Sequence, residues 1–256
     1  MLVLCNGMPR SASTWSYNVA MAVLRRTAEG VYGGYDENLH RFLCGLPASC
    51  VHAVLKCHSL DAAGLGLAQL QAAKVVYTCR DLADATASFM TMFDVDFEHT
   101  IALMSNSLDL YRRHRRNGAL ILSYEAITQR PNESVAAVAS YLNVAVRQEQ
   151  VAEIAEANSF GRMRERVREI SMLDYGERLV RHDRTSYVDA AQDRSYVYDP
   201  DTLLHIDHIR NGSTGYGASR LTQAQLRRLE KLLREKGDEH DVAGPPFMRD
   251  GERRQV

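Results

Sequence analysis

Short apolar runs alternate along the chain with longer stretches in which apolar residues recur every three or four positions. The short runs near 1–6, 52–57, 74–79 and 119–123 predict buried strands. The periodic stretches predict helices near 14–27, 61–71, 84–92, 98–116, 132–142 and 147–157. This alternation is typical of right-handed crossovers, so we expect an α/β fold with a parallel sheet between two helical layers. Ligands of such sheets bind at the carboxyl ends of the strands.

The first predicted strand leads into a segment that is suited to binding an anion. A loop over 6–9 is followed by Arg10-Ser11-Ala12-Ser13-Thr14-Trp15, which begins the first predicted helix. Free N–H groups at a helix N-terminus, with hydroxyls and a guanidinium nearby, can bind phosphate or sulfate. Ser and Thr here are also ordinary helix caps, so both interpretations stay open. The nucleotide-binding pattern G-x-x-x-x-G-K-[ST] lacks its second Gly and its Lys, which disfavours hydrolysis of ATP or GTP.

The same segment resembles a known phosphosulfate-binding loop. Residues 9–15 read P-R-S-A-S-T-W, which is similar to P-K-S-G-T-T-W of sulfotransferases that use 3′-phosphoadenosine 5′-phosphosulfate (PAPS). The resemblance implies that the loop holds the phosphosulfate and that Trp15 stacks on adenine, with a core position as the alternative for this aromatic side chain. The cofactor-binding residues implied by this loop are Arg10, Ser11, Ala12, Ser13, Thr14 and Trp15.

A second motif follows the next predicted strand in the order that this family has. Lys56-Cys57-His58 is similar to the family's K-x-H, which implies that His58 is the general base. An imidazole with a pKa near 6.5 can accept a proton at neutral pH. The resemblance further implies that Lys56 holds the transferring sulfuryl oxygens or the acceptor, and that Arg10 stabilises charge on the leaving oxygen. From the residues alone, two alternatives stay open: His58 as a surface or core histidine that caps a strand, and Lys56 as a solvent-exposed residue at a strand end.

The third predicted strand runs into a segment that resembles the family's site for the 3′-phosphate. Residues 80–88 are similar to R-[ND]-P-x-D-x-x-x-S, in which Arg80 and Ser88 match the two phosphate ligands. Leu82 stands where the family has Pro, and this change removes rigidity from the loop without removing a phosphate contact. After the fourth predicted strand, Ser123-Tyr124-Glu125 resembles the family's F-Y-E-D strand tail, which implies that Tyr124 lies beside the nucleotide.

Two later segments complete the resemblance. Residues 158–163, N-S-F-x-x-M, are similar to the T-S-F-x-x-M segment that packs on adenine, which implies Ser159 and Phe160 as binding residues. Residues 210–215 are similar to R-K-G-x-x-G, the loop that closes over the 3′-phosphate, and this implies Arg210, Asn211 and Gly212. Asn211 replaces a Lys of the family, and Gly217 stands where the family usually has Trp.

The resemblance extends from about residue 2 to residue 225. It implies the three-layer α/β/α, P-loop nucleoside-triphosphate-hydrolase-like sulfotransferase fold, with one domain over 1–256 and a lid or substrate-binding segment over 161–209. It also implies transfer of a sulfuryl group from PAPS to a hydroxyl or amine of a small molecule, as in bacterial small-molecule sulfotransferases, with adenosine 3′,5′-bisphosphate (PAP) as product. Loops at 32–46 and 90–98 are expected to help form the acceptor pocket. A nucleotide or small-molecule kinase and a non-catalytic nucleotide-binding protein are the alternatives.

Composition limits the partners more than it defines them. There are 31 basic and 32 acidic side chains, so no global field attracts nucleic acid or a membrane. The arginine-rich runs 112–116 and 162–168 are expected to be solvated helix faces rather than cofactor contacts. Five cysteines without C-x-x-C spacing predict free thiols in a reducing compartment. No leader, bilayer-spanning run or zinc-like ligand spacing is seen, so we expect a cytoplasmic protein without a metal, and its oligomeric state stays open.

Overall fold

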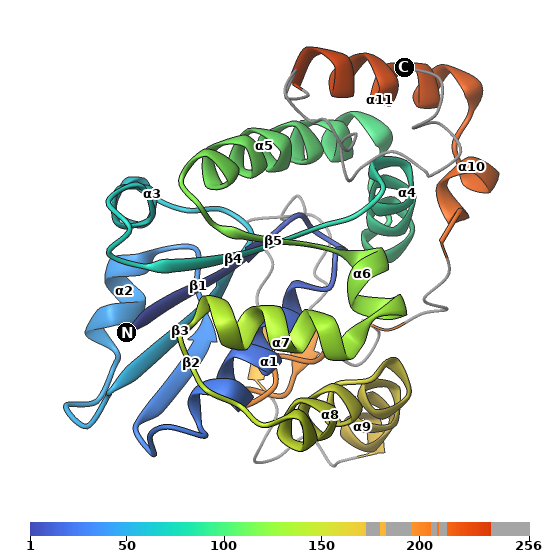
Figure 1. Cartoon of the computed structure of the whole chain (residues 1–256). Coiled ribbons are helices and arrows are strands. Elements are labelled where there is room, and N and C mark those ends of the chain that lie inside the picture. Colours follow the sequence, from blue (N-terminus) through green and yellow to red (C-terminus); the bar gives the residue numbers. More distant parts are fainter. Residues whose placement is uncertain (173–179, 183–195, 206–208, 210–213, 237–256) are drawn as a thin grey trace.

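Five parallel strands form the central sheet of the chain (Figure 1). The computed structural model describes residues 1–172, 180–182, 196–205, 209 and 214–236. The strand order is β2-β3-β1-β4-β5. The strands are β1 (Leu2–Gly7), β2 (Val31–Tyr35), β3 (His52–Cys57), β4 (Lys74–Cys79) and β5 (Leu120–Ser123). The predicted α/β class with a parallel sheet is therefore confirmed.

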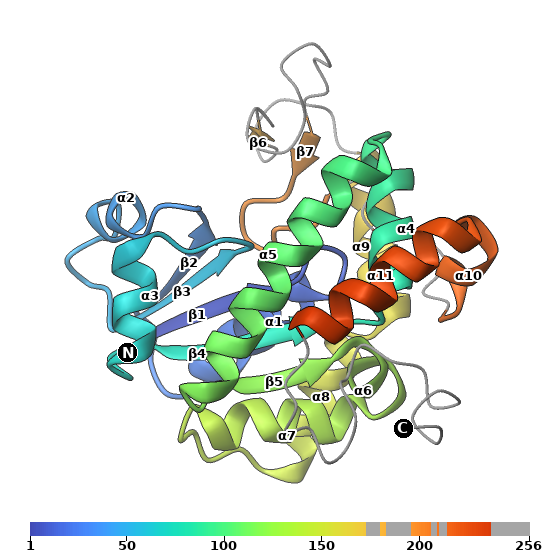
Figure 2. The same cartoon turned by 90° about the horizontal axis from the view of Figure 1, so that it is seen from above.

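Helices cover both faces of this sheet. The helices expected from the apolar period are α1 (Ser13–Leu24), α3 (Ala62–Gln69), α4 (Leu82–Phe93), α5 (Phe97–Arg116), α7 (Pro131–Tyr141) and α8 (Gln148–Ala157). Helices α1, α7 and α8 pack together on one face, while α5 lies on the opposite face with α4 and α11 (Gln223–Lys236) against it (Figures 1 and 2). Because both faces are covered, the central strands are almost wholly buried, and Val3 and Leu4 belong to cores on opposite faces.

Several elements, most of them short, lie where the apolar pattern predicts none. They are β2, α2 (Leu39–Cys44), α6 (Tyr124–Gln129), α9 (Phe160–Met172), β6 (Val180–His182), β7 (Tyr196–Tyr198) and α10 (Tyr216–Arg220). The expected loop at 32–46 is wrong in part, because it holds most of β2 and all of α2. Tyr124 is not the tail of a strand. It begins α6, for which the Ser123 side chain accepts a hydrogen bond from the Ala126 N–H as N-cap.

The sheet order creates a crevice beside the first strand. Strand β1 lies between β3 and β4. The strands that follow β1 in the chain, β2 and β3, lie on one side of it, and β4 and β5 lie on the other. Open α/β sheets bind ligands outside the carboxyl ends of strands at such a reversal. The loop after β1, the end of β3 and the end of β4 therefore meet at one edge.

Candidate functional site

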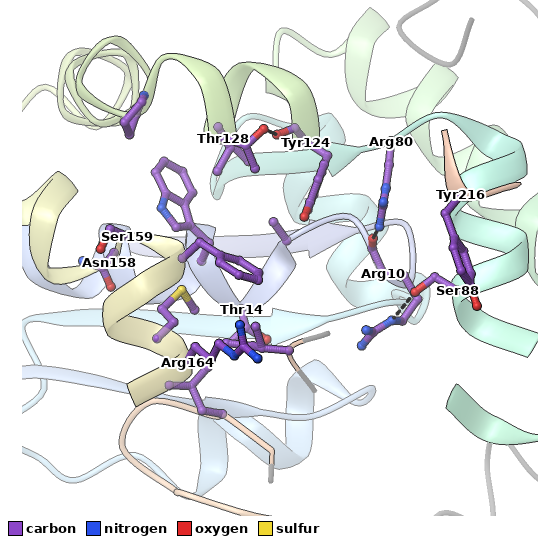
Figure 3. A pocket seen from close by; sticks show the side chains of 18 of the residues that line it. Arg10, Thr14, Arg80, Ser88, Tyr124, Thr128, Asn158, Ser159, Arg164 and Tyr216 are labelled. Carbon is purple, nitrogen blue, oxygen red and sulfur yellow. Dashed lines mark hydrogen bonds between the residues drawn. The ribbon is translucent and has the colours of Figure 1, made fainter. Parts of the chain in front are cut away.

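A cavity of about 640 Å³ lies at this edge of the sheet (Figure 3). Its walls come from the loop after β1, the start of α1, the end of β4 and parts of α4, α6, α9 and α10. Nine of the predicted cofactor-binding residues line it: Arg10, Ala12, Thr14, Trp15, Arg80, Ser88, Tyr124, Ser159 and Phe160. Segments that are far apart in the sequence are thus brought together around one space.

The end of β1 and the loop after it have backbone positions with special requirements. Gly7, the last residue of β1, pairs with Thr78 of β4, and a Cβ on Gly7 would lie 2.2 Å from the Thr78 hydroxyl oxygen, so only glycine fits there. Arg10 and Ala12 both have left-handed backbone conformations, with φ of 67° and 71°. Ala12 is the N-cap of α1 and provides no side-chain cap, which leaves the first N–H groups of this helix available to a ligand.

The hydroxyl groups of this loop have different environments. The Ser11 hydroxyl donates to backbone carbonyl oxygens, of Met8 at 2.6 Å and of Thr78 at 2.9 Å, and neither Ser11 nor Ser13 lines the cavity. Thr14 does line it, is 4 % exposed, and has a hydroxyl oxygen without a hydrogen-bond partner in the described part of the chain. A buried hydroxyl without a partner is costly unless a ligand satisfies it, so Thr14 fits an anion at the start of α1.

A second polar group lies across the cavity from Thr14. Arg10 Nε donates to the Ser88 hydroxyl at 3.1 Å, and Arg80 Nη1 donates to the Arg10 carbonyl oxygen at 3.4 Å. The Arg80 guanidinium carbon lies 4.1 Å from the centre of the Tyr124 ring, which fixes its plane by a cation–π contact. Arg80 and Ser88 are thus both linked to Arg10, one through its carbonyl oxygen and the other through its side chain.

Asp84 fixes the backbone at the start of α10, a role that was not expected from the sequence. Its carboxylate accepts the N–H groups of Gly215 at 2.7 Å and Gly217 at 2.6 Å. A Cβ on Gly217 would lie 2.3 Å from the carbonyl carbon of Ala83, so α10 packs directly on α4 and no Trp fits at this position. The predicted ligands Arg210, Asn211 and Gly212 lie outside the described residues.

The remaining wall of the cavity is apolar. Trp15 is 4 % exposed and belongs to a core cluster that also includes Met163, while Phe160 is 39 % exposed. All three side chains line the cavity. The two alternatives for Trp15 are therefore not exclusive, because this side chain packs in the core and also borders the space in which a flat ring could lie.

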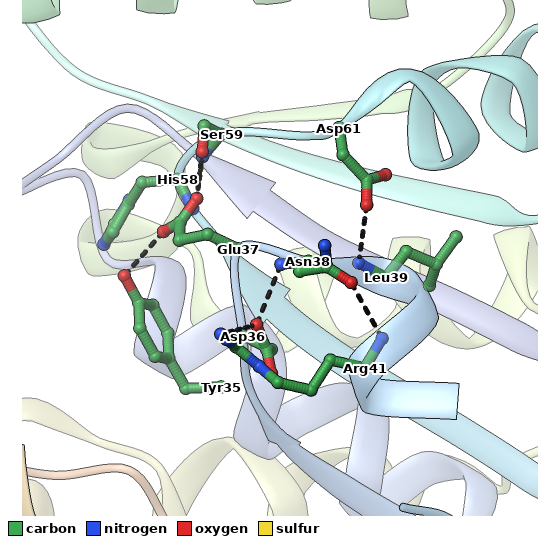
Figure 4. Close-up of polar contacts among 9 residues, drawn as sticks. All are labelled: Tyr35, Asp36, Glu37, Asn38, Leu39, Arg41, His58, Ser59 and Asp61. Carbon is green, nitrogen blue, oxygen red and sulfur yellow. Dashed lines mark hydrogen bonds and ion pairs between the residues drawn. The ribbon is translucent and has the colours of Figure 1, made fainter. Parts of the chain in front are cut away.

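His58 lies outside this cavity, at the end of β3 (Figure 4). Its Nδ1 is 2.8 Å from the Gly7 carbonyl oxygen, which can only accept, so Nδ1 carries the proton and Nε2 keeps a lone pair. Burial and the Lys56 ammonium lower the pKa of His58 to about 4, although the Glu37 carboxylate acts in the opposite direction. The imidazole is therefore neutral at neutral pH and can accept a proton through Nε2.

Glu37 fixes the turn that carries His58, and the sequence analysis did not find it. Figure 4 shows its carboxylate between the end of β2 and the turn after β3. It accepts the N–H groups of His58 at 3.1 Å and Ser59 at 2.7 Å, as well as the hydroxyl of Tyr35 at 2.5 Å. This residue follows a strand that the apolar pattern did not indicate, so no local signal places it beside His58.

Lys56 is buried, which contradicts the alternative of a solvent-exposed strand end. It is 2 % exposed, and its ammonium nitrogen lies 4.8 Å from the centre of the Tyr35 ring. Burying an ammonium group is unfavourable without nearby compensation, so this position indicates a use that requires charge. The Lys56 ammonium and the Glu37 carboxylate thus shift the pKa of the neutral His58 in opposite directions, and the Arg10 guanidinium also lowers the pKa of His58.

The cavity itself is strongly basic. Among its described lining residues are four arginines, at positions 10, 80, 164 and 220, and no Asp or Glu. Within the described residues, no group of three His, Cys, Asp or Glu side chains is placed to hold a metal ion. The part of the chain that the structure describes also has no helix long and apolar enough to cross a membrane. All five cysteines are free.

Comparison with known proteins agrees with this arrangement. The family model described as "Sulfotransferase domain" matches residues 52–239, so the chain belongs to the sulfotransferase domain family. A search of curated proteins finds no match. Among solved structures, mouse sulfotransferase SULT7A1 complexed with PAP is similar at 18 % identity, with a TM-score of 0.62 over 94 % of this chain and 86 % of that chain.

Retinol dehydratase gives two further structural matches. Its complex with androsterone and the inactive cofactor PAP has 17 % identity and a TM-score of 0.58, covering 96 % of this chain and 83 % of that one. Its complex with retinol and PAP has 16 % identity and a TM-score of 0.57, covering 95 % and 83 %. At these identities the likeness shows the fold, which is the sulfotransferase fold expected from the sequence.

Proposed function

We propose that this chain is a sulfotransferase that uses PAPS as donor, modifies a hydroxyl or amine of a small molecule and releases PAP. The observation that carries this proposal is the basic cavity, in which Arg80 and Ser88 lie at one end and Thr14 at the start of α1 lies at the other. The structural relatives support it, since SULT7A1 and retinol dehydratase were both solved with PAP. The domain boundaries 1–256 and the lid over 161–209 belong to the same proposal.

The described residues provide a place for each part of the nucleotide. Arg80 and Ser88 would bind the 3′-phosphate, and the N–H groups at the start of α1 would bind the 5′-phosphosulfate together with the Thr14 hydroxyl. Ser11, Ala12 and Ser13 would contribute through their backbones. Trp15 and Phe160 would enclose the adenine ring between apolar surfaces, and Tyr124, held against Arg80, would border the ribose.

The reaction is a sulfuryl transfer with His58 as base. The acceptor oxygen or nitrogen forms a bond to sulfur, its proton passes to His58 Nε2, and the bond between sulfur and the bridging oxygen breaks. The negative charge that develops on the 5′-phosphate is stabilised by Arg10, which remains a cation throughout. Lys56 is suited to hold the transferring sulfuryl oxygens, because its ammonium is buried beside the base.

The acceptor is proposed only as a class. Retinol dehydratase was solved with androsterone and with retinol, which are small molecules with a hydroxyl group. In this chain the edge near Tyr35 and Glu37, together with the lid segment, would form the acceptor side.

Transfer can be tested directly with isotope-labelled PAPS and a metabolite extract. The proposal predicts a product that gains SO₃ by mass spectrometry and requires the enzyme. A kinase would instead turn over ATP with magnesium. A non-catalytic binding protein would bind PAP and transfer nothing to any acceptor, and either result would contradict the proposal.

A further inference from the structure

One arginine of the basic run on α9 lines the cavity instead of facing only solvent. Arg164 is among the lining residues, although it belongs to a run that we expected to be a solvated helix face. Two positions earlier on the same helix, Arg162 pairs with Glu156 at 3.5 Å and with Glu165 at 2.9 Å. The run thus contains one arginine that forms surface ion pairs and another that borders the binding space.

Arg164 lines the same cavity as Thr14 at the start of α1. In the view of Figure 3 the side chains of Arg164 and Thr14 fall in one region, whereas Arg10, Arg80 and Ser88 fall in another. The hydroxyl of Thr14 is buried without a hydrogen-bond partner in the described part of the chain, and the N-cap of α1 has no side-chain bond. Three features that favour an anion therefore border one cavity: a helix N-terminus, a buried hydroxyl and a guanidinium.

Two of the other arginines that line the cavity are held on the Ser88 side. Arg10 Nε donates to the Ser88 hydroxyl, and Arg80 donates to the Arg10 carbonyl oxygen. Arg80 therefore belongs to the end that fits a 3′-phosphate, and Arg10, which would stabilise charge on the leaving 5′ oxygen, would do so from that same side. A nucleotide with phosphates on both its 3′ and 5′ positions needs a cation at each end.

We infer that Arg164 binds the 5′-phosphate group of the nucleotide, together with Thr14 and the N–H groups of α1. This inference rests on the proposed function and adds to it a residue of α9 that binds the negatively charged 5′ end of the nucleotide. A planar guanidinium can donate two parallel hydrogen bonds to a phosphate or a phosphosulfate, which suits both the donor and its product.

The test compares two nucleotides that differ only in the 5′-phosphate. PAP and adenosine 3′-monophosphate are titrated calorimetrically into the wild-type protein and into Arg164→Gln. Arg164 is exposed, so the variant is expected to fold, and its thermal unfolding is measured alongside. We expect Arg164→Gln to weaken PAP about 3- to 10-fold and to leave adenosine 3′-monophosphate unchanged. Arg164→Lys should recover part of the loss, and PAP binding should depend less on salt in the glutamine variant.

Arg162→Gln is the matched control, because it removes the same charge from the same helix outside the cavity. It should leave the affinity for both nucleotides unchanged. Equal weakening of both nucleotides by Arg164→Gln, or no weakening of PAP, would overturn the inference while the proposed function stands. If PAP does not bind the wild-type protein, both are overturned.

Discussion

The chemistry of the proposed site depends first on the state of one imidazole. The Gly7 carbonyl oxygen fixes the proton of His58 on Nδ1, and burial beside the Lys56 ammonium keeps the ring neutral. A base with a depressed pKa is a weaker proton acceptor, but it stays unprotonated over a wide range of pH. Orientation and charge around it must then supply much of the catalysis.

Replacing His58 by Ala should separate transfer from binding. We expect the rate of sulfuryl transfer to fall about 10²- to 10⁴-fold, which is the usual contribution of a general base, with PAP affinity nearly unchanged. His99→Ala is the matched control, because His99 is exposed on α5 and lies outside both expected acceptor loops. In the wild type, the acidic limb of kcat/KM should reflect a pKa near 4 rather than 6.5, because only the neutral imidazole is active. Transfer by His58→Ala at the wild-type rate would exclude this residue as the base.

Ala12, in the first loop, has a backbone conformation that destabilises any residue with a Cβ atom. Its φ of 71° is in the left-handed region, where a non-glycine residue is disfavoured by about 1–2 kcal/mol. Ala12→Gly removes this strain, but it also increases the conformational entropy of the unfolded chain, which destabilises the fold by about 0.5–1 kcal/mol. The two effects oppose each other, so the free energy of unfolding should change by no more than about 1 kcal/mol. Ala12→Val should lower it by about 1–2 kcal/mol, because a β-branched residue fits this region poorly. Urea denaturation measures both, and a valine variant as stable as wild type would contradict the assigned backbone.

At the scale of elements, the site is held by bonds between segments that are distant in sequence. Glu37 joins the end of β2 to the turn after β3, and Asp84 joins α4 to the start of α10 across more than one hundred residues. Both carboxylates accept two backbone N–H groups, so each fixes a loop rather than a single side chain. We regard both as positioning residues.

Glu37→Gln should loosen the His58 turn without affecting the nucleotide cavity. The amide turns one acceptor oxygen into a donor that faces N–H groups, which costs about 1–3 kcal/mol. We expect kcat to fall about tenfold, PAP affinity to stay the same, and the acidic limb of the pH profile to move further down, because the Glu37 charge raises the pKa of His58. Glu29→Gln, on an exposed side chain, is the control. A loss as deep as that of His58→Ala would contradict a positioning role.

The sequence predicted the strongly apolar elements well and the short or polar ones poorly. Strands β1, β3 and β4 are apolar runs with both faces buried, so their pattern is strong, and β5 is a shorter apolar run at the edge of the sheet. Strand β2 reads V-Y-G-G-Y at the edge of the sheet, where two glycines and an exposed Tyr32 remove the signal. Helices α2 and α6 have six residues each, which is too short for an apolar period.

The same reasoning separates the site residues that sequence could and could not find. Arg80, Ser88, Thr14 and Trp15 stand in motifs that follow predicted strands, and all four line the cavity. Glu37 acts across tertiary contacts, and Arg164 borders the cavity through the placement of α9, so no local pattern marks either residue. The carboxylate of Asp84 lies inside a recognised motif, yet its partners are amides more than 130 residues away.

At the scale of the whole molecule, two partly or wholly buried histidines link folding to pH. Burial lowers the pKa of His114 and of His58 to about 4, and the Lys56 ammonium adds to the effect at His58. Both groups have a pKa near 6.5 when unfolded, so between pH 6.5 and 4 the unfolded chain binds more protons. Stability is therefore present above pH 6.5 and is lost as the pH falls through this window.

His114→Gln should reduce this dependence on pH. The His114 Nε2–H donates to the Asn6 side-chain oxygen at 3.2 Å, and the glutamine amide can also donate. The slope of unfolding free energy against pH should decrease by up to about 1.4 kcal/mol per pH unit between pH 6.5 and 4. Urea midpoints at several pH values measure the slope. An unchanged slope would show that His114 does not titrate with folding.

The central claim is that the ends of β1 and β4 together bind the two phosphates of one nucleotide. Calorimetric titration of PAP into the folded protein tests it most directly, with Ser88→Ala as a variant that removes one hydroxyl of the 3′ end. The account predicts one PAP per chain, with about 5-fold weaker binding or more to Ser88→Ala because a charge-assisted hydrogen bond is lost. If the folded wild-type protein takes up no PAP, the account is wrong.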